Sequence, residues 1–499
     1  MTRRFKDYAD ILHQHAVNRG GHTALYHEQD CISYALLEEN VNRFGNLLKS
    51  IGLTAGERIV LALPDCPDAF YAFLGAMKCG LQPVLLSADM PRSSYAEVLR
   101  DAAPSALITT GASEVLKAGA GSAMPTLCID DGAYPGRLGQ ASPSLAPSPP
   151  SEDGVDFFLY SSGSTGKPKG VPHSQGDMLF CAEHYAGKVL EMSADDVVLS
   201  ASKLHFAYGL GNSLIFPLYF GASVVLNPRN AGPADIFHLF QLIAERRPTL
   251  FFAVPTLYNM MAKTMDEGGS FSSIRLCVSA GEALPEGLYR EWQRLTGLEI
   301  LDGIGSTEAL HIFISNRPGR TVPGKTGVLV QGYEARIIGE DGRPLPSGRP
   351  GTLLIRGRST ARSYWRRPDR TAKTMLADGW LDTGDVFIEE NGCYTYQGRR
   401  DDLFKSGGNW VSPLKVEHVL RDHPAVLECA VTSRPMEGLQ KPVAYVVLKP
   451  GCEKEAGLPR KMRSFVLERL PAYMCPVRFI FTEQLPKTGT GKIQRSALH

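Results

Sequence analysis

The sequence lacks any long apolar run. Its longest apolar stretches are far shorter than the ~20 residues that a helix needs to cross a bilayer, and no apolar signal core follows the charged residues 1–7. It also lacks an excess of either charge, because 53 basic and 52 acidic residues leave a net charge of +1. Nucleic acids and anionic membranes attract strongly basic surfaces, so we expect neither as a partner.

The sequence contains no C-x-x-C pair. Its ten cysteines are scattered singly from Cys31 to Cys475. This spacing is typical of reduced thiols and not of a disulfide framework or a zinc site, which favours a cytoplasmic protein. A chain of 499 residues is long enough for two or more domains.

Segments with helical and strand-like apolar patterns alternate along the chain. Between residues 37 and 51 apolar residues recur at alternating steps of four and three, and Gly52 follows as a stop signal. The next predicted elements are a strand at 58–63, a helix at about 65–78 and a strand at 83–86; the order recurs as a helix at 235–246, a strand at 249–254, a helix at 255–265 and a strand at 274–279. This alternation predicts an α/β fold with parallel sheets covered by helices, which bind ligands beyond the carboxyl ends of their strands.

The pattern changes near residue 400. Beyond it we expect a helix that begins at Ser412 and Pro413, strands at 425–432 and 443–448, a helix at about 460–470 and a strand at 477–481. We therefore predict a large N-terminal domain at 1–399, with a smaller β-rich portion, and a small mobile α+β C-terminal domain at 400–499. The Pro/Ser-rich stretch 135–151 is predicted to be an exposed connector inside the first domain.

Residues 160–170 read YSSGSTGKPKG and follow the apolar run 155–159. Such a loop offers backbone N–H groups, hydroxyls and lysine ammonium groups to one anion, such as a polyphosphate. It is not a Walker loop, which has four residues between its glycines and a Ser or Thr after its Lys. A flexible linker is the alternative interpretation, but a linker does not require two lysines interleaved with Pro and Gly. The composition therefore favours phosphate contact.

Three further segments carry polar groups at positions where they could bind a ligand. The segment GIGSTE at 303–308 follows a strand-like run, and its one carboxylate suits Mg²⁺, although a solvated Glu in a turn is the alternative. The segment WLDTGD at 380–385 has acids around a Thr-Gly turn, which would either accept hydrogen bonds from ribose hydroxyls or stabilise the turn. The segment PKTGTGK at 486–492 sets two lysines on a flexible loop, and taken alone it is a basic tail.

Taken together and in this order, these segments resemble the adenylate-forming superfamily of acyl-CoA synthetases, adenylation domains and luciferases over nearly the whole chain. The segments KLHFAYGLGN at 203–212 and DGIGSTEALHIF at 302–313 are similar to the benzoate–CoA ligase branch.

This resemblance implies a role for each matching residue. The ATP phosphates would be held by Ser161, Ser162, Gly163, Ser164, Thr165, Gly166, Lys167 and Lys169. The adenosine would be bound by Gly281, Glu282, Ala283, Asp302, Gly303, Asp385 and Arg399, the last two at the ribose hydroxyls. Thr307 would touch the α-phosphate, Glu308 would hold magnesium, and Lys492 matches the catalytic lysine of the family. Asp401 matches the hinge, and Gly407 and Gly408 would face coenzyme A.

The acyl pocket implied by the resemblance contains Phe206, Ala207, Tyr208, Gly209, Gly305, His311 and Ile312, with Gly303 beside it. Glycines next to an aromatic and a branched side chain would leave a flat slot for a ring. Phe206 takes the position of an aromatic gate where many relatives have histidine, so we assign no catalytic role to His205. His311 would hydrogen-bond the substrate carboxylate, a ring substituent or a backbone carbonyl, and core packing is the competing interpretation for Phe206 and Tyr208.

The resemblance implies an ATP-dependent aryl-CoA ligase that uses Mg²⁺ and coenzyme A. A stand-alone enzyme that loads an aryl acid onto a carrier-protein phosphopantetheine fits the same motifs, and a homodimer stays open. A non-catalytic nucleotide-binding protein is the third alternative, against which Thr165, Glu308, Asp385 and Lys492 argue. The chemistry needs cations because a carboxylate and a phosphate about 4 Å apart repel by several kcal/mol at an effective dielectric near 20.

We predict that Lys492→Ala abolishes acyl-AMP formation, because the ammonium group would no longer offset this repulsion. Thioester formation from supplied acyl-AMP should be largely preserved, since the two half-reactions need different groups at one place. Pyrophosphate exchange and thioester assays on the purified variant measure the two steps separately. Equal losses in both steps would contradict the assignment.

Overall fold

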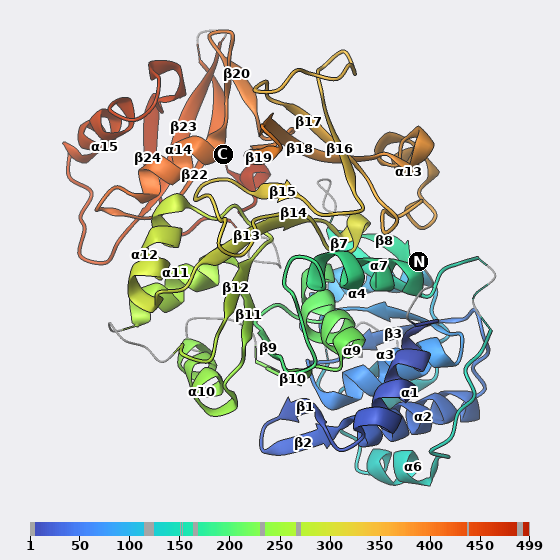
Figure 1. Ribbon diagram of the computed structural model, residues 1–499. Helices are drawn as coiled ribbons and strands as arrows, with labels where there is room; N and C mark the ends of the chain where they lie inside the picture. The colour runs from blue at the N-terminus through green and yellow to red at the C-terminus, as the bar shows by residue number, and fades with distance from the viewer. Residues whose placement is uncertain are drawn as a thin grey trace. The chain divides into compact units, whose positions relative to one another are not determined.

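The protein is described from a computed structural model (Figure 1) that covers residues 5–113, 124–149, 151, 153–162, 168–229, 235–265, 271–436, 439–486 and 493–498. Contacts divide the chain into two compact units. The larger unit contains Met1–Glu334 and Ile355–Leu381, and the smaller unit contains Ala335–Leu354 and Asp382–His499. This grouping does not locate a hinge, so the boundary at residue 400 stays a prediction.

The larger unit contains a six-stranded sheet in the order β6-β5-β3-β4-β7-β8. Its strands are β3 (Arg58–Ala62), β4 (Gln82–Leu85), β5 (Ala106–Thr109), β6 (Thr126–Cys128), β7 (Phe157–Ser162) and β8 (Pro168–His173). All neighbours pair in parallel except β7 and β8, which form an antiparallel hairpin. The described helices that come before or between these strands in sequence include α2 (Tyr34–Ser50), α3 (Pro67–Lys78), α4 (Arg92–Ala102) and α6 (Tyr134–Gln140).

A second sheet of the larger unit has the order β15-β14-β13-β12-β11-β9-β10-β1-β2. Its strands are β1 (Thr23–His27), β2 (Asp30–Ser33), β9 (Val197–Ser200), β10 (Ser223–Val225), β11 (Leu250–Ala253), β12 (Leu276–Ser279), β13 (Ile300–Gly305), β14 (Ile312–Ser315) and β15 (Gly327–Leu329). The run from β13 to β1 is parallel, while β2, β14 and β15 are antiparallel to their neighbours. The predicted α/β class with parallel sheets is confirmed.

The remaining helical segments of the larger unit are α1 (Tyr8–Arg19), α7 (Gln175–Cys181), η2 (Ala182–Ala186), α8 (Ala207–Leu210), η3 (Gly211–Ile215), α9 (Phe216–Phe220), α10 (Ile236–Arg246), α11 (Pro255–Thr264), α12 (Glu286–Thr296), η5 (Thr307–Ala309), α13 (Pro368–Thr374) and η6 (Ala377–Gly379). In Figure 1, α10, α11 and α12 lie along one face of strands β9 and β11–β13.

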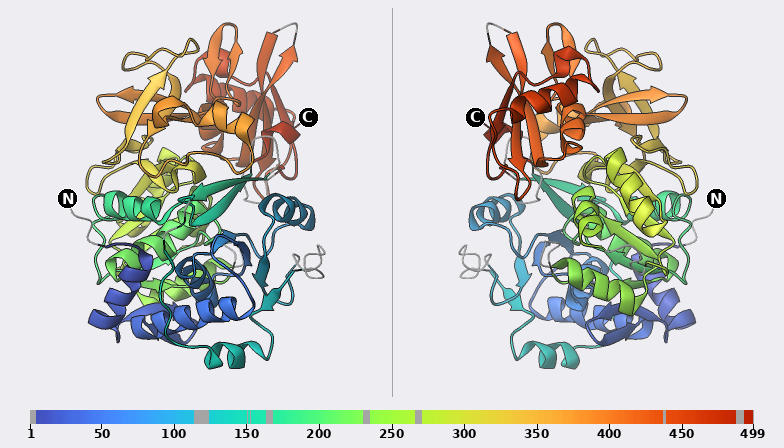
Figure 2. Two further views of the ribbon diagram at one scale, coloured as in Figure 1. Left: turned by 90° about the vertical axis from the view of Figure 1, so that its right-hand side faces the viewer. Right: turned by 90° about the vertical axis from the view of Figure 1, so that its left-hand side faces the viewer.

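The smaller unit contains further strands, which are among the gold, orange and red segments of Figure 2. One group of strands has the order β16-β17-β18-β19, and another has the order β22-β23-β24 beside a separate β20–β21 hairpin. The bounds are β16 (Glu334–Ile338), β17 (Gly351–Arg356), β18 (Leu381–Glu390), β19 (Cys393–Arg399), β20 (Phe404–Ser406), β21 (Asn409–Val411), β22 (Val426–Met436), β23 (Leu439–Leu448) and β24 (Arg478–Phe481). Its helical segments are α14 (Pro413–Arg421), α15 (Leu458–Leu467), η7 (Ala472–Met474) and η8 (Arg495–Ala497).

The apolar periodicity correctly located α2. Leu37, Val41, Phe44 and Leu48 are all buried on one face of this helix. Gly52 has a φ of +89°, a left-handed conformation that glycine adopts without strain and that suits the end of a helix. The start of α14 also matches its prediction, because Ser412 accepts a hydrogen bond from the backbone N–H of Lys415 as an N-cap should.

Two local expectations were wrong. The stretch 135–151 is not an exposed connector throughout, because 135–140 belong to α6 and Leu145 is buried. A Cβ atom on Gly45 would come within 2.4 Å of the Leu145 side chain, so this stretch packs tightly on α2. The acids at 382 and 385 do not flank a turn, since β18 runs continuously from Leu381 to Glu390 and Gly384 takes its positive φ inside the strand.

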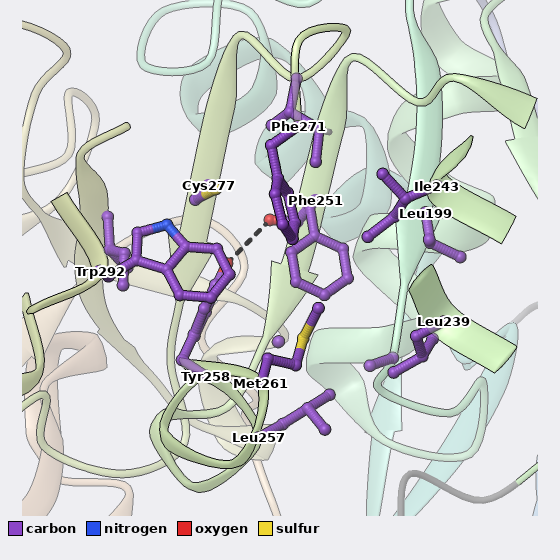
Figure 3. Packing of buried hydrophobic residues seen from close by; sticks show 14 of the residues in the cluster. Leu199, Leu239, Ile243, Phe251, Leu257, Tyr258, Met261, Phe271, Cys277 and Trp292 are labelled. Carbon is purple, nitrogen blue, oxygen red and sulfur yellow. Dashed lines mark hydrogen bonds between the residues drawn. The ribbon is translucent and has the colours of Figure 1, made fainter. Parts of the chain in front are cut away.

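The core beneath α10, α11 and α12 is built around aromatic side chains (Figure 3). Trp292 of α12 is fully buried, and its ring centroid lies 4.8 Å from that of Tyr258 and 5.3 Å from that of Phe271. The hydroxyl group of Tyr258 donates to the backbone oxygen of Phe251 in β11. This packing holds the helices on the strands whose carboxyl ends carry the predicted nucleotide residues.

We predict that Trp292→Ala lowers the free energy of unfolding by about 3–5 kcal/mol, because it removes a large buried ring and leaves a cavity. Phe237 of α10 is 70% exposed, so Phe237→Ala is a matched control and should change stability by no more than about 0.5 kcal/mol. Urea unfolding followed by circular dichroism measures both. A similar loss for the two variants would contradict the role given to this core.

Candidate active site

Predicted site residues of the larger unit lie where strands end. Ser161 is the next-to-last residue of β7, Asp302 and Gly303 belong to β13, and 281–283 follow β12. Ser279 of β12 pairs with Asp302 of β13, so the loop after β12 starts beside Asp302. The residues predicted for adenosine in this unit therefore share one sheet edge, as expected for a parallel sheet.

Two of the predicted phosphate and metal residues meet directly. The ammonium group of Lys169 lies 3.2 Å from Oε1 of Glu308. Lys169 stands opposite Ser161 in the β7–β8 hairpin, whereas Glu308 lies in η5, 139 positions further along the chain. The fold thus joins the lysine-bearing strand to the predicted metal ligand.

A third residue, Tyr364, completes this contact and was missed from the sequence. Its hydroxyl group is 2.7 Å from Oε1 of Glu308 and 2.7 Å from Nζ of Lys169. Burial by itself raises the pKa of Glu308, but Lys169 and Tyr364 more than offset it and leave the pKa below its ordinary value. Glu308 is therefore an ionised carboxylate inside the protein. No spacing rule connects Tyr364 to the predicted motifs, so the sequence carries no signal for it.

The link from β13 to β14 holds residues predicted for different substrates. Glu308 and His311 stand three positions apart in it, and Gly305 pairs with Ile312 at its ends. Leu310 has a φ of +67°, an uncommon and strained conformation for a residue with a side chain. Hydrogen bonds from the backbone N–H groups of Ala309 and Leu310 to Ser306 and Thr307 hold this tight turn in place.

The same turn is attached to α7 through His173. Its Nε2 donates to the backbone oxygen of Thr307 at 2.8 Å, and its Nδ1 lies 3.2 Å from Asp177. Asp177 also belongs to a capping box with Ser174 at the start of α7. The backbone of Thr307 is therefore fixed from outside the turn.

The buried carboxyl group of Asp302 has an uncommitted oxygen. Its Oδ1 has no hydrogen-bond partner among the residues that the structure describes. Burial raises the pKa of Asp302 well above its ordinary value. A buried polar atom without a partner is costly, so this oxygen fits a hydrogen-bond donor on a ligand. The nearby side chain of Glu282 instead accepts a hydrogen bond from Thr256 of α11.

His311 lies among aromatic rings. Its ring centroid is 4.5 Å from Phe216, 5.2 Å from Tyr185 and 5.6 Å from Tyr208. Its Nε2 lies 3.2 Å from Oδ1 of Asn212, and since a carbonyl oxygen only accepts, the neutral ring carries its proton on Nε2. Burial lowers the pKa of His311 to about 3. Asn212 and Tyr185, like Tyr364, were not singled out from the sequence.

Phe206 and Tyr208 are placed differently. Phe206 is 36% exposed and lies against the ring of His205, with the centroids 4.1 Å apart, so it is not part of the buried core. Tyr208 is enclosed, and its hydroxyl group donates to the backbone oxygen of Val278. Ala207 and Ile312 are also buried.

The glycines near the predicted pocket are explained by close backbone packing and not by an open slot. A Cβ atom on Gly209 would lie 2.0 Å from the backbone oxygen of Lys203, and one on Gly305 would lie 2.5 Å from that of His311. A Cβ on Gly211 would lie 2.2 Å from the imidazole of His311. Close backbone packing, and not the flat slot inferred from the sequence, therefore accounts for Gly209 and Gly305.

In the smaller unit, the predicted ribose ligands face each other. Asp385 of β18 pairs with Arg399 of β19, and Nη1 of Arg399 lies 3.0 Å from Oδ1 of Asp385. Asp401 is exposed just after β19. Gly407 and Gly408 form the exposed turn of the β20–β21 hairpin with φ values of +58° and +82°.

Some predicted residues lie outside the described part of the chain. These are Gly163, Ser164, Thr165, Gly166, Lys167 and Lys492, together with the side chain of Ser162. Among the described residues, no helix is long and apolar enough to cross a membrane, and no group of three or more His, Cys, Asp or Glu side chains could hold a metal ion.

Comparison with known families identifies the class of protein. Residues 12–365 match the AMP-binding enzyme family, and residues 415–492 match the AMP-binding enzyme C-terminal domain. The chain belongs to the AMP-binding enzyme family, as the sequence motifs predicted.

Comparison with individual proteins shows which members of this family the chain is similar to. The chain is 41% identical to the benzoate–CoA ligase of Thauera aromatica, covering 100% of this chain and 96% of that protein. Its fold is similar to that of a benzoate CoA ligase from Burkholderia xenovorans LB400, with a TM-score of 0.90, 37% identity and 99% of both chains covered. It is also similar to the anthranilate CoA ligase AuaEII in complex with anthranoyl-AMP, with a TM-score of 0.92, 35% identity and coverage of 99% and 96%.

We predict that His311→Gln flattens the pH dependence of stability. Because the pKa of His311 is about 3 in the folded protein, against an ordinary value of 6.5 for a solvated histidine, the unfolded chain binds the extra proton between these values. Acidification below pH 6.5 should therefore cost the natural protein about 1.4 kcal/mol per pH unit through this group, and the variant should lack that share. Urea unfolding between about pH 7 and pH 5 measures the difference, and parallel curves would contradict it.

Proposed function

We propose that the protein is an ATP-dependent aryl-CoA ligase. It activates benzoate or a hydroxy-, amino- or halobenzoate as acyl-AMP with release of pyrophosphate, and then transfers the acyl group to coenzyme A. The observation that carries this proposal is the β13–β14 link, where the largely buried carboxylate of Glu308 and the ring-lined His311 stand three residues apart. The similarity to ligases named for benzoate and anthranilate supports it.

ATP would bind along the strand ends of the larger unit. The hairpin residues Ser161 and Lys169 would hold its phosphates, together with the loop that contains Thr165. Oδ1 of Asp302 would accept a hydrogen bond from the exocyclic amine of adenine, which its missing partner among the described residues favours. Asp385 and Arg399 would bind the ribose hydroxyls.

Magnesium fits the side chains present. Glu308 is ionised, and the described residues offer no cluster of three ligands that would hold a metal without a substrate. Mg²⁺ commonly uses one or two protein carboxylates and completes its shell with phosphate oxygens and water. Bound at Glu308, the ion would neutralise charge on the phosphates.

In the first half-reaction, an oxygen of the aryl carboxylate attacks the α-phosphorus and the bond to pyrophosphate breaks. Lys492 and Thr307 would contact the oxygens on which negative charge gathers. In the second half-reaction, the thiolate of coenzyme A attacks the acyl carbon and AMP leaves with the electron pair of the broken bond. A turn of the C-terminal domain, 400–499, at Asp401 would withdraw Lys492 and bring Gly407 and Gly408 to the site.

The acyl group would lie by Phe206, Ala207, Tyr208 and Ile312, with His311 nearby. The Nε2–H of the neutral His311 ring already donates a hydrogen bond to Oδ1 of Asn212. His311 would therefore line the part of the pocket that holds the substrate ring, and it would not neutralise the substrate carboxylate.

The expected result is pyrophosphate release that depends on ATP, Mg²⁺ and an aryl acid, measured over a panel of substituted benzoates. Glu308→Gln should lower this rate by about a hundredfold or more, because it removes charge where transition-state charge is stabilised. Glu286→Gln is a matched control, since Glu286 is an exposed residue in a surface pair with Arg290. Absence of release with every aryl acid would overturn the proposal.

The alternative acceptor is a carrier-protein phosphopantetheine, which presents the same thiol. Thioester formation with free coenzyme A at micromolar concentration distinguishes the two. Activity only with a carrier protein would identify a stand-alone adenylation enzyme.

A further inference from the structure

Tyr364 is a buried hydroxyl between two opposite charges. The residue is 3% exposed, its hydroxyl group is 2.7 Å from both Glu308 and Lys169, and Nζ of Lys169 also lies over its ring, 4.1 Å from the centroid. A lysine ammonium group only donates, and an ionised carboxylate only accepts. The single phenol proton must therefore point to Oε1 of Glu308, while the phenol oxygen accepts from Lys169.

The backbone around Tyr364 is fastened to both segments that it joins. The N–H of Ala361 donates to the backbone oxygen of Glu308 at 2.7 Å, and the N–H of Trp365 donates to that of Gly170, next to Lys169, at 2.9 Å. The N–H of Tyr364 itself donates to the side-chain oxygen of Thr371 in the middle of α13. The phenol is thus presented from a backbone that is hydrogen-bonded to both segments.

Tyr364 and Lys169 interact with Glu308 in different ways. The ammonium of Lys169 sits on a flexible stem, and its attraction to Glu308 can be exchanged for attraction to an incoming phosphate. The phenol has no charge to exchange, and its hydrogen bond to a charged oxygen is of the strong kind. Tyr364 can therefore keep Glu308 in one orientation while the cation beside it changes.

We propose that Tyr364 is a positioning residue that holds the Glu308 carboxylate ready for the magnesium ion of Mg·ATP, a role that rests on the proposed function. Groups that hydrogen-bond a metal-binding carboxylate fix its orientation and raise metal affinity. If Tyr364 has this role, loss of its hydroxyl group affects only the steps that use the metal. Loss of a residue that merely supports the fold would affect every step.

Tyr364→Phe tests this proposal, since it keeps the ring beneath Lys169 and removes only the hydroxyl group. We expect the Mg²⁺ concentration for half-maximal pyrophosphate exchange to rise about tenfold, as for loss of other groups that orient metal ligands. The KM for benzoate and the rate of thioester formation from supplied benzoyl-AMP should stay within about twofold of the natural protein. Binding of Mn²⁺ in the presence of a non-hydrolysable ATP analogue, followed by electron paramagnetic resonance, should weaken by the same factor.

Tyr258→Phe is the matched control. Tyr258 is a fully buried tyrosine of the same unit whose hydroxyl group donates to backbone oxygens of Phe251 and Val278, far in sequence from Glu308. It should lose stability without a change in Mn²⁺ affinity. In a Glu308→Gln background, Tyr364→Phe should produce no further loss of Mn²⁺ affinity, because the two residues act as one unit.

Unchanged Mn²⁺ binding by a folded Tyr364→Phe protein would overturn the inference, and so would an equal loss in Tyr258→Phe. If the Tyr364→Phe protein unfolds near the assay temperature, the Mn²⁺ titration is carried out at low temperature, where it still shows whether Mn²⁺ affinity falls. Failure of the natural protein to exchange pyrophosphate with any aryl acid would instead refute the proposed function.

Discussion

A carboxylate that is largely removed from water keeps its charge only if the fold supplies a cation and hydrogen-bond donors. Glu308 receives both from distant parts of the chain, Lys169 on β8 and Tyr364 in the segment before α13. Three separate segments must therefore come together before this group can exist in ionised form. The antiparallel return of β8 along β7 and the attachment of 361–365 to both partners meet that requirement.

The same requirement explains the shape of the β13–β14 link. Glu308 must face Lys169, while His311 faces the aromatic rings of a different region. Only a very short turn separates the two, and Leu310 takes the strained backbone conformation that this reversal demands. The strain is held by hydrogen bonds within the turn and by His173 from outside it.

Sequence periodicity located the framework well, because helices such as α2 bury one face and parallel strands are continuously apolar. Local motifs pointed to Lys169 and Glu308, and the resemblance to a known family pointed to Asp302, since such motifs are short and continuous in sequence. None of these signals found Tyr364, whose contact with Glu308 spans 56 positions and follows no period. The acids of β18 were misplaced in a turn because Gly384, with its positive φ, looks like a turn residue although it lies inside a strand.

Gly211 limits which substitutions are possible beside the proposed acyl pocket. Its α-carbon passes so close to the imidazole of His311 that even a methyl group would overlap the ring. The backbone and the ring therefore interlock, and neither position is free to vary alone. A change of substrate shape at this place would therefore require paired substitutions. A smaller side chain would have to replace His311 before, or together with, any replacement of Gly211. Lineages that take the two changes in the opposite order would cross a poorly folded intermediate.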